Sequence, residues 1–379
     1  MFELADAGTL GFDDERLARI APFLAKTYID SGRLPNAQLV IARDGQPVHY
    51  TKLGSMGDDK RELRDDALFR IASMTKPVTS IAFMQLVEQC EVALEEPVAR
   101  IFPEFADLKV YAGGGGAIPF APGKPASAMR FVDLLTHMSG LTYGLQNRNN
   151  IDAAYRENNF DFARDHLDSD AFIEKLSKLP LEFAPGTGWN YSVSTDVLGV
   201  AVERISGMRL GDYFEKHIFA PLGMTDTHFG VAEGQSERLV DAYAYQPGHA
   251  PKMINAGATS KLNEPGAFDS GGGGLIGTIA DYHRFSTMLL NGGDLDGARI
   301  VSPKTIRLMR TNHLPNNADL TEMSSSLFSE ANNAGTGFGL GFAMVIDPSK
   351  TLMPSSEGEF YWGGAYSTAF FVDPVERIT

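Results

Sequence analysis

The chain has 379 residues, of which 43% are hydrophobic and 21% are charged, a composition that excludes wholesale disorder. At about 100–200 residues per domain, this length predicts two or three domains. The formal net charge is −15 and the sequence holds no basic patch of the kind that contacts phosphates, so we expect neither nucleic acid nor membrane as a partner.

The N-terminal third of the chain predicts a helix, a hairpin and a second helix. Apolar residues recur every three or four positions from Phe12 to Tyr28, as on an amphipathic helix. Residues 37–54 contain two β-rich runs that flank Asp44-Gly45, a dipeptide typical of a two-residue hairpin turn. From Pro77 to Phe105 we expect a helix and then a loop. The helix is apolar on several faces, so we expect it to be buried on most sides, with Cys90 inside it and unreactive.

The middle of the chain alternates between helical patterns and loops. Residues 106–130 are rich in Gly and Pro, and their glycine run lacks the GK[ST] ending of a phosphate-binding loop, so we expect a surface loop. Helical patterns return in four segments, at 131–136, 170–178, 195–206 and 211–219.

The last third predicts strands with intervening helices, because glycines punctuate short runs rich in Phe, Ile and Val. The closing segment, 360–379, predicts two strands and an Asp373-Pro374 turn that opens a further strand. Three residues of that strand are present, so we expect the chain to stop short of its natural C-terminus. The overall plan is a sheet made from both ends of the chain, with a helical block inserted between them.

Several features point to a cytoplasmic protein. No apolar run approaches the roughly 18–20 residues that a membrane helix needs, and the acidic N-terminus does not resemble a signal peptide. A single cysteine excludes a disulfide framework and cysteine-rich zinc sites. We expect a monomer or a small homo-oligomer.

The first candidate for chemistry is the pair Ser73 and Lys76, three residues apart at the predicted start of a helix. A serine hydroxyl needs a nearby base to become a nucleophile, and a lysine amine can serve if its surroundings favour the neutral form. The alternative is a serine that caps the helix beside a solvated lysine.

Two further candidates lie far along the chain. Tyr191 precedes a helical stretch, and a phenol can shuttle a proton between a serine and a leaving group. The consecutive glycines of Trp362-Gly363-Gly364 are typical of a strand that a ligand approaches closely, and a backbone N–H there could stabilise an oxyanion together with that of Ser73. The alternatives are a packing tyrosine and a β-bulge.

The sequence lacks the motifs that other common catalytic chemistries require. There is no G-x-S-x-G pentapeptide, no H-E-x-x-H pair and no cysteine cluster, so we expect no metal and no cofactor. His137 is typical of a structural, hydrogen-bonding histidine. Asp294-x-Asp296-Gly297 lacks the glutamate that closes a calcium loop, so we expect a turn.

The order S-x-x-K at 73, Y-S-x at 191 and W-G-G at 362 resembles the serine β-lactamase and penicillin-binding-protein superfamily. Within it, the chain is similar to the class C β-lactamase-like carboxylesterases, or family VIII esterases, over about residues 10–376. The resemblance implies an α/β (α+β) fold, in which helices from both chain ends flank an antiparallel sheet and an all-helical domain is inserted. We place the α/β domain at 1–75 and 265–379, and the helical domain at 76–264.

The resemblance also implies roles for the candidate residues. Ser73 would be the acylated nucleophile, Lys76 and Tyr191 its proton-transfer partners, and the backbone N–H groups of Ser73 and Ala365 the oxyanion hole. Substrate contacts would come from the W-G-G strand and nearby aromatic side chains: Trp362, Gly363, Gly364, Tyr143, Trp189, Phe338 and Phe360.

Two departures from the β-lactamases of this type bear on the substrate. They carry K-T-G and Y-A-N where this chain has W-G-G and Y-S-V. Without the polar side chains of K-T-G and Y-A-N, this chain lacks charge-assisted contacts to a substrate worth ~1.5–3 kcal/mol each. Their absence favours neutral substrates. We therefore expect a serine carboxylesterase acting on small, short-chain neutral esters. The alternatives are a promiscuous β-lactamase or amidase, an acyltransferase, and a non-catalytic penicillin-binding-like module.

Overall fold

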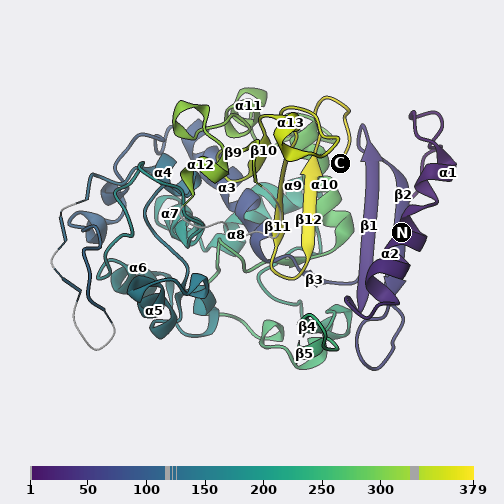
Figure 1. The fold of residues 1–379 in the computed structure, drawn as a ribbon, viewed down its shortest axis with the longest axis horizontal. Coiled ribbons are helices and arrows are strands. Elements are labelled where there is room, and N and C mark those ends of the chain that lie inside the picture. Colours follow the sequence, from purple (N-terminus) through teal and green to yellow (C-terminus); the bar gives the residue numbers. More distant parts are fainter. Residues whose placement is uncertain (1, 116–119, 122, 125, 325–332) are drawn as a thin grey trace.

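The computed structural model describes residues 2–115, 120–121, 123–124, 126–324 and 333–379 (Figure 1). The glycine run predicted as a surface loop therefore lies partly outside the described residues. No helix within these ranges is long and apolar enough to cross a membrane.

The N-terminal part forms the predicted hairpin with short helices on one side (Figure 1). Strands β1 (Asn36–Arg43) and β2 (Gln46–Gly54) pair antiparallel, with Arg43 opposite Gln46. Asp44 and Gly45 both have positive φ, as the two-residue turn requires. The region predicted as one amphipathic helix consists of three short helical segments instead, α1 (Asp14–Leu17), α2 (Ile20–Leu24) and a π-helical turn at Ala25–Ile29.

The C-terminal part forms a four-stranded antiparallel sheet in the order β12-β11-β10-β9. Its strands are β9 (Thr336–Phe338), β10 (Ala343–Val345), β11 (Phe360–Gly364) and β12 (Thr368–Val372). Residues 377–379 join this sheet to the hairpin, because Ile378 bridges both Arg43 and Asp373. The two ends of the chain thus lie side by side (Figure 1), as the sequence predicts.

Helix α10 (Ile279–Leu290) packs against both of these units. The Tyr282 ring lies 5.1 Å from that of Phe370 on β12, and His283 Nε2 lies 3.2 Å from the Gly45 carbonyl in the hairpin turn. This helix therefore ties the N-terminal hairpin to the C-terminal sheet.

The middle of the chain is mainly helical. Its helices are α3 (Thr75–Glu88), α4 (Phe131–Leu135), α5 (Asn150–Glu157), α6 (Ser169–Leu176), α7 (Ser194–Ser206), α8 (Leu210–Phe214) and α9 (Ala220–Leu222). One antiparallel strand pair follows them, β4 (Ala242–Ala244) with β5 (Lys252–Asn255). The division into domains at 76 and 264 stays a prediction.

Smaller elements connect these parts. Two short antiparallel pairs are β3 (Phe69–Arg70) with β6 (Ile276–Gly277) and β7 (Asp294–Leu295) with β8 (Ala298–Arg299). Asp296 and Gly297 form the turn between β7 and β8, which confirms the predicted turn. Within the described residues, the remaining α-helices are α11 (Pro303–Met309), α12 (Leu320–Met323) and α13 (Pro348–Thr351).

Helix α3 lies at the centre of the hydrophobic core, as its apolar faces predict. Every residue from Thr75 to Leu86 is buried, and the helix packs mainly against α7. The prediction for Cys90 was wrong: α3 ends at Glu88, and Cys90 follows it with a positive φ and an exposed side chain.

Candidate active site

Ser73 lies in a short 3₁₀ turn, Ala72–Met74, that leads directly into α3. Ala72 has φ 45°, a left-handed conformation that is uncommon for a residue with a Cβ and is often found at functional sites. Met74 occupies the N-cap position of α3 and no side chain caps the helix, so the alternative of a capping serine is wrong. The half-buried Ser73 hydroxyl is therefore available for other contacts.

Lys76 points back toward Ser73 from the first turn of α3. Its Nζ donates to the Gly272 carbonyl at 2.6 Å and to Ser73 Oγ at 3.2 Å. The residue is only 1% exposed, so the alternative of a solvated lysine is wrong as well. Within the described part of the chain, no carboxylate oxygen lies within ion-pair distance of this amine. A buried amine in contact with a serine hydroxyl can take that hydroxyl's proton.

Tyr191 lies above the same amine, in the loop before α7. Lys76 Nζ is 4.5 Å from the centre of the Tyr191 ring. The loop is held by two backbone hydrogen bonds, from Asn190 N to the His137 carbonyl at 3.0 Å and from Val193 N to the Thr142 carbonyl at 3.1 Å. The fold thus places Tyr191 beside Ser73 and Lys76, more than a hundred positions earlier in the sequence.

The end of β11 lies against the segment that carries Ser73. Thr368, which pairs with Gly364, donates its hydroxyl to the Ile71 carbonyl at 3.2 Å. A Cβ at Gly364 would lie 2.4 Å from that carbonyl oxygen, so only glycine permits this approach. The exposed turn that begins at Ala365 is consequently held beside the Ser73 segment, the arrangement that an oxyanion hole built from both requires.

Four of the predicted pocket residues gather around Tyr191. The Tyr143 and Trp362 rings lie 5.3 and 5.5 Å from the Tyr191 ring, Trp189 stacks on it at 6.3 Å, and Phe338 contacts both tryptophans. Gly363 and Gly364 continue β11 from Trp362.

Phe360 does not lie with these aromatic residues. Like Phe338 it has no exposed surface, but its ring packs 4.8 Å from that of Phe342 and, among the described residues, contacts none of the rings around Tyr191. We therefore correct its predicted pocket role and assign it to the core, where it begins β11.

His137 ends a chain of buried hydroxyl groups behind Tyr191. Its Nδ1 lies 3.1 Å from Ser192 Oγ, and hydroxyl contacts of 2.7 Å continue to Ser194 and Ser139. Burial lowers the pKa of His137 well below its ordinary value, with the neighbouring lysine charge acting in the same direction. The burial of His137 and its hydrogen bond with Ser192 agree with the predicted structural, hydrogen-bonding histidine.

Sequence reasoning missed Asp196, a buried carboxylate in the first turn of α7. It accepts hydrogen bonds from Ser270 Oγ at 2.5 Å and from Gly272 N at 3.1 Å, and it is close enough to raise the pKa of Tyr143, which burial raises most. The available signal was an acidic residue directly before the apolar run 197–202, five positions after Tyr191.

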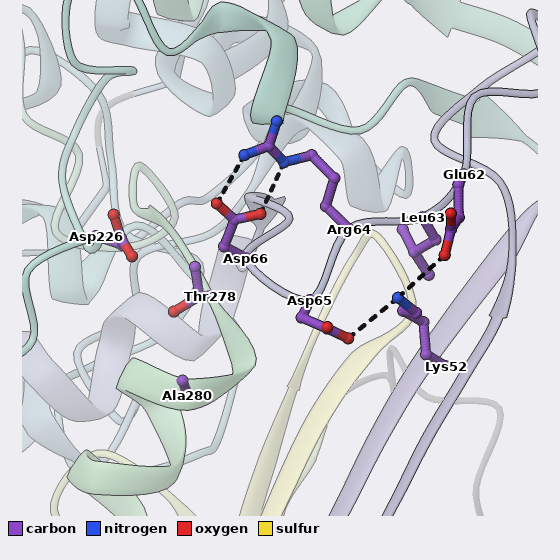
Figure 2. A pocket seen from close by; sticks show the side chains of 9 residues that line it. All are labelled: Lys52, Glu62, Leu63, Arg64, Asp65, Asp66, Asp226, Thr278 and Ala280. Atoms are coloured by element: carbon purple, nitrogen blue, oxygen red, sulfur yellow. Dashed lines mark hydrogen bonds and ion pairs between the residues drawn. The ribbon is translucent and has the colours of Figure 1, made fainter. Parts of the chain in front are cut away.

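An open hollow of about 510 Å³ lies elsewhere, between the loop 62–66 and the start of α10 (Figure 2). Its charged side chains are in ion pairs: Lys52 with Glu62 and Asp65 at 3.6 and 3.1 Å, Arg64 with Asp66 at 2.7 Å, and Asp226 with Arg238 at 2.7 Å. None of the predicted site residues lines it. Among the described residues there is no group of three or more His, Cys, Asp or Glu side chains that could hold a metal ion.

Comparison with known proteins matches this chain to one family over most of its length. The model of the family described as "Beta-lactamase" matches residues 20–379. Esterase EstB of Burkholderia gladioli is 33% identical over 359 residues, covering 90% of this chain and 83% of EstB. Lovastatin esterase of Penicillium rubens is 30% identical over 362 residues, covering 91% and 87%. The solved structure of EstCE1, "a hydrolase with promiscuous acyltransferase activity", matches with a TM-score of 0.79 and 26% identity over 96% of this chain and 92% of EstCE1.

Proposed function

The chain belongs to the beta-lactamase family, as its ordered motifs predict, and we propose that it is a serine carboxylesterase that hydrolyses short-chain neutral esters. The observation that carries the proposal is the buried Lys76 amine, 3.2 Å from Ser73 Oγ and beneath the Tyr191 ring. The names of EstB and lovastatin esterase support the same activity.

The proposed reaction has two halves that share one proton-transfer unit. Ser73 Oγ attacks the ester carbonyl carbon and its proton passes to the Lys76–Tyr191 unit, while the Ser73 and Ala365 N–H groups receive the negative charge on oxygen. The alcohol leaves with that proton, and the acyl group stays on Ser73. Water then attacks the acyl carbonyl, the bond to Ser73 breaks, the acid is released and Ser73 recovers its proton.

The surroundings of Ser73 support a neutral, apolar substrate. The W-G-G strand presents an indole where the β-lactamase resemblance would place a lysine, and the buried rings of Tyr143, Trp189 and Phe338 pack around Tyr191 and this indole. Both indole N–H groups, of Trp189 and Trp362, lack an acceptor among the described residues.

A second candidate function is acyl transfer from the same acyl-enzyme to an alcohol. The similarity to EstCE1 supports it, since that hydrolase is described as having promiscuous acyltransferase activity. The two functions differ only in whether water or an alcohol resolves the acyl group on Ser73. Product analysis in the presence of added alcohol separates them. Location in the cytoplasm and the absence of nucleic acid, membrane and cofactor partners stay predictions.

The direct test is hydrolysis of p-nitrophenyl butyrate by the parent protein and by Ser73→Ala, with nitrocefin as a β-lactam in parallel. We expect the parent to hydrolyse the ester, the variant to be at background and nitrocefin to be turned over poorly. Equal ester rates in both proteins would overturn the assignment of Ser73. Rapid nitrocefin turnover would instead favour a β-lactamase.

A further inference from the structure

We propose that Asp196 is a positioning residue for Lys76: it holds Gly272 so that the Gly272 carbonyl fixes the lysine amine, and it keeps a negative charge behind that amine. The inference rests on the proposed function, because it assigns a role toward a base in that reaction. Asp196 itself has no described contact with Ser73.

The geometry is a short relay across one glycine residue. Asp196 Oδ1 accepts from Gly272 N at 3.1 Å, and the Gly272 carbonyl accepts from Lys76 Nζ at 2.6 Å. The carboxylate belongs to the first turn of α7 and the amine to the first turn of α3. Gly272 therefore connects the start of α3, where Ser73 and Lys76 lie, with the start of α7, which follows Tyr191.

The glycine run 271–274 makes this close approach possible. A Cβ at Gly272 would lie 2.3 Å from Asp196 Oδ2, and one at Gly271 would lie 2.7 Å from the Thr195 carbonyl oxygen. No larger residue fits at either position without moving α7 or the loop. The glycine run therefore serves to place one carbonyl against Lys76.

The charge of Asp196 requires an explanation beyond its hydrogen bonds with Ser270, Gly272 and Tyr143. Its side chain is buried with only 4% of the residue exposed, and burial raises its pKa, while the Lys76 charge and the hydrogen bonds from Ser270 and Gly272 act in the opposite direction. A neutral asparagine could accept the hydrogen bonds from Ser270 and Gly272 without the cost of burying an anion. A carboxylate at this position has the further property that it stabilises a cation at Lys76.

The charged and titratable groups around this pair come from several elements. Those that face Asp196 or Lys76 are Tyr143 and His137 from the loops around α4, Asp161 from the 3₁₀ segment after α5, and Tyr191 from the loop before α7. Among them, Asp196 and Asp161 bring negative charge. Asp161 accepts instead from the backbone N–H groups of Gly144 and Leu145.

The consequence is a pH signature. An anion near an amine favours the protonated amine, so removing it makes the amine lose its proton at lower pH. We expect Asp196→Asn to move the limb of the kcat/KM profile that depends on Lys76 toward lower pH by at least ~0.5 units. A purely structural role would lower the rate and leave the limb in place.

The matched control is Asp281, which has the same local setting at the start of another helix. It lies in the first turn of α10, is buried, and accepts from one backbone N–H (Asp226) and one hydroxyl (Thr227), both at 2.8 Å. It contacts none of the candidate catalytic residues. Asp281→Asn thus tests whether neutralising any buried aspartate has the same effect.

The experiment measures pH profiles of kcat and KM for p-nitrophenyl butyrate in the parent, Asp196→Asn and Asp281→Asn, with Ser73→Ala as the reference for the nucleophile. We expect Asp196→Asn to lower kcat by ~10- to 100-fold, to change KM less than ~3-fold and to shift the limb, whereas Asp281→Asn does none of these. An unmoved limb in Asp196→Asn, or an equal loss in Asp281→Asn, would overturn the inference. Full activity in Ser73→Ala would overturn the proposed function instead.

A milder variant covers the case in which Asp196→Asn does not fold. Ser270→Ala removes the 2.5 Å hydrogen bond to Asp196 and leaves the carboxylate in place. We expect kcat to fall ~3- to 10-fold because the carboxylate loses one of its anchors and keeps those to Gly272 and Tyr143. A parental kcat in Ser270→Ala, with a folded protein, would contradict the positioning role.

Discussion

The Asp281 carboxylate at the start of α10 bonds to the surrounding fold, whereas Ser73 and Lys76 at the start of α3 bond to one another, and Lys76 also bonds to a glycine carbonyl. In α10, Thr278 caps the helix by accepting from Asp281 N at 3.2 Å, and the Asp281 carboxylate accepts from the neighbouring loop. In α3 no side chain caps the helix, and the Ser73 hydroxyl contacts Lys76 Nζ.

The difference shows how one kind of local structure can serve either stability or chemistry. Both helix starts have backbone N–H groups that precede the i−4 hydrogen bonds of the helix, and both carry hydroxyl and ionisable side chains. A hydroxyl that caps a helix uses its oxygen to accept a backbone hydrogen bond, whereas a hydroxyl that does not cap the helix keeps its oxygen for attack on a substrate. We therefore expect substitutions at the start of α3 to change rates and those at the start of α10 to change stability.

The largest effect should come from Lys76→Met, which keeps the length of the side chain and removes its amine. We expect kcat/KM for p-nitrophenyl butyrate to fall at least ~1,000-fold, because Ser73 loses its proton acceptor. The control is Gln85→Met, further along α3, where another buried polar side chain donates to two carbonyls at 3.1 Å. A loss smaller than tenfold in Lys76→Met, or an equal loss in Gln85→Met, would contradict the role of Lys76 as the proton acceptor for Ser73.

Tyr191→Phe should have the next largest effect, since it removes one hydroxyl and keeps the ring that packs on Lys76, Tyr143 and Trp362. We expect kcat to fall ~100-fold with little change in melting temperature. Tyr213→Phe is the matched control, because the buried Tyr213 hydroxyl has no partner among the described residues. Steady-state kinetics that find Tyr191→Phe as active as Tyr213→Phe would exclude the phenol from proton transfer.

On the other side of the comparison, Asp281→Ala should reduce stability and leave catalysis unchanged. It removes the acceptor of a buried backbone N–H and a buried hydroxyl, which costs about 2–3 kcal/mol. We expect the melting temperature to fall by roughly 5 °C and kcat to stay within twofold of the parent. A tenfold loss of kcat without a change in melting temperature would assign α10 a catalytic role.

The smallest effect concerns Glu359, which lies just before β11. Burial and the nearby Asp373 charge raise the pKa of Glu359 from 4.5 to about 7. Because the folded protein holds this proton more tightly, the contribution to stability is full below about pH 4.5 and is lost as the pH rises through about 7. Since the side chain is only half-buried, solvent reduces the effect.

Glu359→Gln should therefore have the parental melting temperature at pH 5 and one ~2 °C higher at pH 8. Thermal melts across this range, with kcat measured at each pH, check both the sign and the absence of a catalytic effect. A variant that is less stable than the parent at pH 8 would show that the carboxylate is stabilised by its surroundings.

Sequence reasoning identified most of the candidate site because its chemistry uses particular residue types in a particular order. Ser73, Lys76 and Tyr191 were found from two short motifs, and W-G-G located the strand that ends beside Ser73. The hairpin around Asp44-Gly45 and the buried character of α3 followed from turn chemistry and periodicity. The resemblance to a family supplied the long-range arrangement.

The remaining features depend on contacts between distant segments. Asp196 carries no motif, and its meaning appears only when the glycine run 271–274 lies between it and Lys76. Phe360 and Trp362 share one face of β11, yet one reaches the core and the other the site, and alternation alone does not separate them. Cys90 was misplaced because an apolar pattern does not mark the residue at which a helix ends.

The central claim is that Ser73 is a nucleophile activated by the groups gathered at the start of α3. The most direct measurement is labelling of the folded protein with a fluorophosphonate, followed by intact-mass determination and peptide mapping. We predict one label per chain, on the peptide that contains Ser73, no label in Ser73→Ala and at least ~100-fold slower labelling in Lys76→Met. A label on another serine, or unchanged labelling in Ser73→Ala, would contradict the account.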